Sequence, residues 1–113
     1  MPAPVHYVIQ IEIDPPNLNP TPGSPGTKSG NFVYLPSLLR CNPGDTVEWR
    51  CAHPFSLTFI DVTPTDEVEL FADSGTTGPH TITAASGQFH YAVAVYKHPR
   101  VFMDASCPHI SVN

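Results

Sequence analysis

Basic charge is scarce in this chain of 113 residues. It has five Lys and Arg residues against ten Asp and Glu, which gives a formal net charge of −5 at pH 7. The bases are scattered singly, as Lys28, Arg40, Arg50, Lys97 and Arg100. A protein that neutralises nucleic-acid phosphates needs clustered Lys and Arg side chains. We therefore expect no nucleic-acid partner.

Long apolar runs are missing as well. None approaches the roughly 20 residues that a membrane-spanning helix needs. The first ten residues, MPAPVHYVIQ, have neither a basic region nor a small-residue cleavage site. For the chain as written, we expect no association with a membrane and a cytoplasmic location.

Charged residues make up only 13% of the sequence, whereas Pro and Gly number 14 and 7. This composition indicates many turns and few long helices. The residues from 15 to 31 are rich in Pro and Gly and follow a well-formed strand pattern, so we interpret them as a long loop inside the domain. The whole chain, 1–113, is then expected to be a single domain.

Alternation of apolar and polar residues predicts short strands. In TVEWRC, for example, Val47, Trp49 and Cys51 are expected to point inward, and Glu48 and Arg50 outward. NFVYLPSLLRC is expected to be a strand that lies at a sheet edge or bends at its proline. PTDEVELF is expected to form a single helical turn, and GQFHYAVAVY the central strand of a sheet. Seven to eight strands separated by turn signals predict an all-β fold, a Greek-key β-sandwich.

Catalytic motifs are not found in the sequence. His53 and Ser56 are neighbours, but no acidic residue is placed to orient the histidine and no glycine-rich turn surrounds the serine. There is neither a phosphate-binding loop nor a dinucleotide fingerprint. The acidic residues between Asp61 and Asp73 lack the spacing of a calcium loop and are expected to be solvated. We expect that the protein is not an enzyme.

Two segments, PGDTVEWRCAHPFSLTFID and GQFHYAVAVYKHPRVFMDASCPHISVN, resemble the corresponding part of the cupredoxins. The resemblance covers about residues 40 to 113 and implies a cupredoxin-like sandwich. It places Phe55 where the family has its first ligand histidine and Tyr96 where it has the ligand cysteine, while His98 and Met103 remain in the ligand loop. A blue-copper centre needs one thiolate and two imidazoles. The resemblance therefore implies a sandwich without a blue-copper site.

Two matching Cys-x-His units, CAH at 51–53 and CPH at 107–109, are expected at the same pole of a cupredoxin-like sandwich. Cys51, His53, Cys107 and His109 could then form a tetrahedral zinc or copper site, with His98 and Met103 as further candidate ligands. A Cys51–Cys107 disulfide requires the same proximity, and two buried free thiols are the third alternative.

The remaining cysteine and two of the remaining histidines have ordinary structural explanations. Cys41 is expected to be unpaired, and His6 and His90 fall on strand faces opposite the main apolar stripe. From these observations we expect a non-catalytic binding or structural module with no cofactor and with a protein or small-molecule partner of unknown identity. The alternative is a protein that binds zinc or copper through its two Cys-x-His units.

Overall fold

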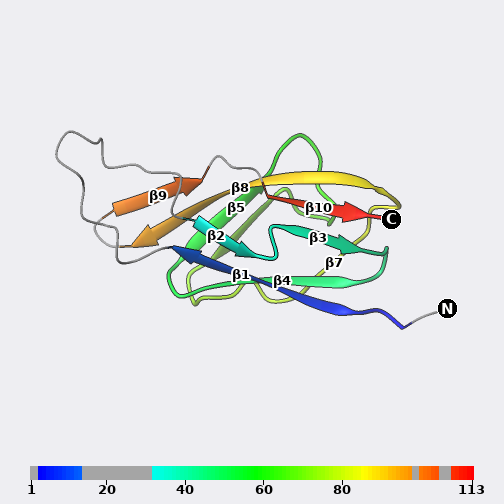
Figure 1. Ribbon diagram of the computed structural model, residues 1–113, viewed down its shortest axis with the longest axis horizontal. Coiled ribbons are helices and arrows are strands. Elements are labelled where there is room, and N and C mark those ends of the chain that lie inside the picture. Colours follow the sequence, from blue (N-terminus) through cyan, green and yellow to red (C-terminus); the bar gives the residue numbers. More distant parts are fainter. Residues whose placement is uncertain (1–2, 14–31, 98–99, 105–107) are drawn as a thin grey trace.

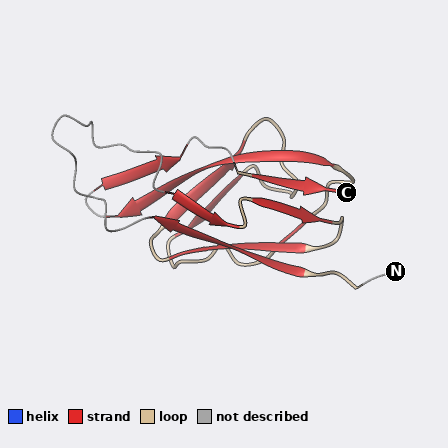
Figure 2. Ribbon diagram, viewed as in Figure 1, coloured by secondary structure: helices blue, strands red, loops and turns tan. Residues whose placement is uncertain are grey.

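The computed structural model of the chain describes residues 3–13, 32–97, 100–104 and 108–113. Strands joined by turns make up this part of the chain, and it contains no helix (Figure 1; Figure 2). The ten strands are β1 (His6–Ile13), β2 (Phe32–Leu35), β3 (Leu38–Cys41), β4 (Thr46–Cys51), β5 (Phe55–Phe59), β6 (Glu69–Ala72), β7 (His80–Thr81), β8 (Gly87–Lys97), β9 (Arg100–Asp104) and β10 (His109–Val112). The predicted all-β class is confirmed.

The strands form two sheets that pack face to face. The first sheet has the order β2-β1-β4-β7, and the second has the order β3-β10-β8-β5-β6, with β9 beside β8. Figure 1 shows the first sheet lying against the second, with the end of β10 and the start of β1 at the same end of the molecule. The inner faces enclose one buried cluster, in which Trp49 contacts the rings of Phe59 and Tyr91 edge-on. The predicted β-sandwich is confirmed.

Strand β4 shows how the alternating pattern produces this core. Val47 and Trp49 are fully buried, as the sequence predicts. The turn before β4 is held by Asp45, whose side chain accepts hydrogen bonds from the backbone N–H groups of Val5 and Asn42, both at 2.9 Å. Gly44, just before it, has a φ of 92°, which suits glycine far better than other residues. This turn therefore aligns the start of β1 with the start of β4.

The predicted strand around Pro36 is in fact two strands in different sheets. Strand β2 pairs antiparallel with β1, whereas β3 pairs parallel with β10. Proline interrupts the ladder because it has no N–H to donate. The chain crosses from one sheet to the other at this point, which is one reason why the described residues form ten strands where seven to eight were predicted.

The predicted helical turn in PTDEVELF is wrong. The end of this segment instead belongs to β6, which pairs with β5 in the register Leu57↔Leu70. Before β6, the hydroxyl of Thr63 donates to the carbonyl oxygen of Glu67 at 2.6 Å, and the Thr65 hydroxyl accepts from the N–H of Glu67 at 3.1 Å. Short polar side chains that bond the nearby backbone in this way compete with helix formation.

Strand β8 lies at the centre of the second sheet, as predicted. It pairs with β5 along one edge and with β10 and then β9 along the other. The described residues include no helix long and apolar enough to cross a membrane. The predicted loop at 15–31 lies in the part of the chain outside the described residues.

Candidate functional site

The corner between β4 and β5 carries the first group of candidate residues. Cys51 ends β4 and Phe55 begins β5, with His53 in the turn between them. Phe55 is fully buried in the core and lies in register with Val95 of β8. The position that the resemblance assigns to a ligand histidine is therefore filled by an aromatic ring packed between the sheets.

Cys51 is also buried, although it borders a pocket. Its backbone N–H donates to the carbonyl oxygen of Gly75 at 2.9 Å, which fixes the end of β4. Burial raises the pKa of the Cys51 thiol, and nearby backbone N–H groups of Ala52 and His53 offset only part of that effect. The thiol is therefore protonated at neutral pH and is a poor nucleophile in this state.

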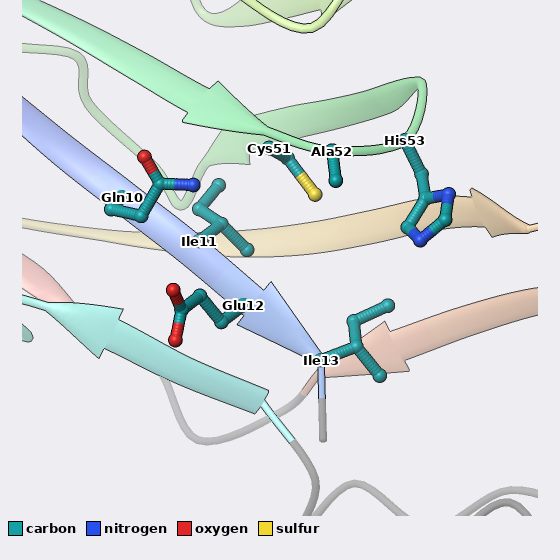
Figure 3. A pocket seen from close by; sticks show the side chains of 7 residues that line it. All are labelled: Gln10, Ile11, Glu12, Ile13, Cys51, Ala52 and His53. Atoms are coloured by element: carbon teal, nitrogen blue, oxygen red, sulfur yellow. The ribbon is translucent and has the colours of Figure 1, made fainter. Parts of the chain in front are cut away.

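The pocket beside this corner has a volume of about 340 Å³ and lies between the end of β1 and the β4–β5 turn. Figure 3 shows the Cys51 sulfur and the His53 ring extending toward the end of β1. The lining is mostly side chains of β1 and this turn, namely Gln10, Ile11, Glu12, Ile13, Cys51, Ala52 and His53.

His109, the other described member of the predicted metal set, lies elsewhere. It is in register with His90 on β8. The β4–β5 corner lies beside a different part of β8, because the carbonyl oxygen of Pro54 in that corner accepts a hydrogen bond from the N–H of Tyr96, six residues further along the strand. Six residues of extended strand span about 20 Å. In the part of the chain that the structure describes, no three His, Cys, Asp or Glu side chains lie close enough together to hold a metal ion. Cys51, His53 and His109 therefore do not form a shared metal site.

Cys107 and His98 lie outside the described residues. The Cys51–Cys107 disulfide, the free-thiol alternative and the part of Cys107 in any metal site therefore stay predictions. Cys41 is buried with a free thiol. Burial, assisted by the negative charge of Asp45, raises the pKa of the Cys41 thiol to about 11.

The two positions that depart from the cupredoxin pattern face opposite ways. Phe55 shares its inward face with Val95, so Tyr96, the next residue on β8, points outward and is partly exposed. Met103 on β9 is in register with Ala94 and also faces outward. Because inward and outward positions alternate along a strand, residues 55 and 96 do not converge on one centre.

A polar cluster that the sequence did not suggest lies on the outer face of the first sheet. Glu48 points outward, as predicted, but its neighbours cover it so that only 8% is exposed. Its carboxylate accepts hydrogen bonds from Arg50 Nε at 2.9 Å, from the Thr76 hydroxyl at 2.5 Å and from His6 Nε2 at 3.1 Å. These hydrogen bonds, first those from Arg50 and Thr76, lower the pKa of Glu48 to about 2.

One sequence signal could have found this cluster. Glu48 and Arg50 are oppositely charged and two residues apart, so they share one face of β4. The parallel neighbour β1 then places His6 beside Thr46, and the His6 Nδ1 and Thr46 hydroxyl lie 2.8 Å apart. The cluster links β1, β4 and the segment before β7, and its geometry is that of a structural tie.

An apolar patch covers part of the outer face of the second sheet. We define it as Phe71, Tyr96, Val101 and Met103, on β6, β8 and β9. Met103 is 67% exposed and Phe71 61%, and the rings of Phe71 and Tyr96 lie 6.2 Å apart. Exposed apolar patches of this kind mark surfaces that bind other molecules.

The fold is therefore an all-β sandwich with a small pocket at one corner and an apolar patch on one outer face. No family model and no curated protein matches the chain. Among solved structures, the chain is similar to a novel purple cupredoxin from Nitrosopumilus maritimus, at 24% identity over 92% of this chain and 98% of that one, with a TM-score of 0.47.

Proposed function

We propose that this protein is a non-catalytic, cupredoxin-like binding module without a blue-copper centre, and that a partner protein docks on its apolar patch. The exposed patch is the observation that supports this proposal most directly. Its four side chains are large and contiguous, and each is between 39% and 67% exposed.

The strand registers make the patch continuous. Ser56 of β5 is in register with Phe71 on one side and with Ala94 on the other, and Ala94 is in register with Met103. Residues in register share a face, so small side chains lie between the large ones. A partner surface can therefore contact all four strands at once.

Charge indicates the chemistry of the partner. The segment from Asp61 to Asp73, which contains β6, holds five acids and no base, all five acids are exposed, and Glu69 of β6 is among them. The carboxylate of Glu69, two residues from Phe71 on the same outward face of β6, attracts a surface with Lys and Arg side chains and disfavours a second copy of this chain. The partner we propose is therefore a protein with an apolar surface bordered by basic residues.

The absence of a blue-copper centre is part of the same proposal. Phe55 fills the inner position, Tyr96 is a phenol rather than a thiol, and the two point to opposite faces. A blue-copper centre needs a thiolate and imidazoles that converge on one ion. Adding Cu²⁺ should therefore not produce the intense visible absorption of a copper–thiolate bond.

The test is quantitative affinity purification of the tagged protein from its source cells, with Phe71→Ser/Met103→Ser as the patch variant. We expect at least one protein that co-purifies with the wild type at low salt, that is depleted with the patch variant and that is released by added salt. Val33→Ser is the matched control, because Val33 is an exposed apolar residue of β2 in the other sheet.

Two results would count against the proposal. The first is a set of co-purifying proteins that is the same for wild type and patch variant. The second is concentration-dependent self-association in sedimentation velocity that the patch variant abolishes, which would make a second copy the occupant of the patch.

A further inference from the structure

The outer face of the second sheet carries a second feature, a pair of histidines on adjacent strands. His90 of β8 and His109 of β10 are in register, and their ring centroids lie 4.6 Å apart with an interplanar angle of 33°. His90 is exposed and His109 is partly exposed. The two imidazoles thus lie side by side on an accessible surface.

The ladder explains why these rings are so close. The N–H of Tyr91 donates to the carbonyl oxygen of Pro108 at 3.0 Å. This backbone hydrogen bond joins the neighbouring residue pair, Tyr91 and Pro108, and not His90 and His109. His90 and His109 are therefore a non-hydrogen-bonded pair, in which antiparallel strands bring opposite side chains closest together. The β-sheet holds the two rings at a spacing that flexible loops would not maintain.

From this geometry, we propose that His90 and His109 form a surface site for a divalent transition-metal ion, with Zn²⁺ as the ion to test. Neutral imidazole is a preferred ligand of such ions. Zn–N bonds of about 2.0–2.1 Å place two ligand nitrogens roughly 3.3 Å apart in a tetrahedral site. With ring centroids 4.6 Å apart, rotation about the broad ring torsions of the two histidines would bring a nitrogen of each to this spacing.

Among the described residues, the register positions next to the pair on β8, β10 and β3 add no carboxylate, thiol or third imidazole. Gln88 and Ser111 form the next register pair on the same face, one row along the strands. The neighbouring β3 places Leu38 and Arg40 beside His109 and Ser111 and so offers no carboxylate there. Two imidazoles and exchangeable water make an open site, which can accept a ligand from another molecule.

This site differs from the one predicted from the Cys-x-His units, although both contain His109. The predicted set needs Cys51 and His53, which lie at the β4–β5 corner, and does not use His90. Replacing His90 therefore distinguishes the proposed site from the predicted one, because only the proposed site uses His90. His53→Gln serves as the matched control, since it removes one imidazole at the corner and leaves the histidine pair intact.

The experiment is an NMR titration of the full chain with Zn²⁺ at pH 7.5, in which backbone amide shifts locate the ion. We expect saturable shifts centred on residues 89–91 and 109–111. Loss of one chelating imidazole should weaken binding by about tenfold or more in both His90→Gln and His109→Gln. His53→Gln and Cys51→Ser should bind as the wild type does.

Three outcomes would overturn the proposal: shifts centred on residues 51–53, a His90→Gln variant that binds Zn²⁺ as tightly as the wild type, or no saturable binding. Unchanged urea midpoints confirm that the variants fold, which is expected because His90 is exposed and His109 is partly exposed. The shifts in the wild-type protein locate the ion independently of any variant.

Discussion

Replacing Glu48 with glutamine should remove much of the acid sensitivity of this fold. The three hydrogen bonds to its carboxylate lower the pKa of Glu48 from 4.5 to about 2. The folded state therefore binds the Glu48 proton less readily than the unfolded chain does. The resulting stabilisation is fully present above about pH 5 and is lost as the pH falls toward 2.

The size of the effect follows from the same pKa values. Each unit of pKa difference between the folded and unfolded states corresponds to about 1.4 kcal/mol, so the ceiling is roughly 3.4 kcal/mol. The side chains of Arg50 and His6 are 53% and 44% exposed, so water and salt screen their interaction with Glu48. We expect about 1–2 kcal/mol of pH-dependent stability from Glu48.

Urea unfolding followed by the fluorescence of Trp49, at several values between pH 7 and pH 2.5, measures this contribution. The wild type should lose stability over the acid range, and Glu48→Gln should show a flatter profile by the stated amount. Glu69→Gln is the control, because Glu69 is an exposed carboxylate on β6. Parallel pH profiles for wild type and Glu48→Gln would refute the assignment of acid sensitivity to this cluster.

Three further predictions concern the core, the turn before β4 and the thiols. Trp49→Ala should cost about 3–5 kcal/mol of unfolding free energy by urea titration. Trp49→Phe should cost less than about 2 kcal/mol, because a phenyl ring keeps most of the buried aromatic surface. Asp45→Ala should cost about 1.5–3 kcal/mol in the same assay, since two backbone N–H groups lose a charged acceptor. Thiol counting in urea without reductant should give one free thiol if Cys51 and Cys107 are bonded and three if they are not, and Cys41 should react slowly in the folded protein because it is buried.

The alternating strands could be predicted because a period of two directly encodes an inner and an outer face. Trp49 and Val47 are buried where the pattern placed them. Burial of Glu48 could not be predicted in the same way. It depends on the parallel pairing of β1 with β4 and on Thr76, which arrives from 28 residues further along the chain.

The candidate site was harder to predict than the fold. Sequence comparison can assign residues 55 and 96 to ligand positions, but it does not give the register that places Phe55 beside Val95. A shift of one residue in register moves a side chain to the opposite face of a sheet. The directions of Phe55 and Tyr96 could therefore be read only from the paired strands.

The patch and the histidine pair are linked by the strand that carries both. His90 and Tyr96 lie on the outer side of β8, six residues or about 20 Å apart. A protein interface of ordinary size buries about 800 Å² on each partner, which corresponds to a disc roughly 30 Å across. A partner centred near Ala94, which is in register with Met103 and lies four residues or about 13 Å from His90, would therefore extend as far as the histidine pair, and one of its own side chains could occupy an open position on a metal ion held there. If both proposals hold, Zn²⁺ should tighten partner binding to the wild type and leave binding to His90→Gln unchanged.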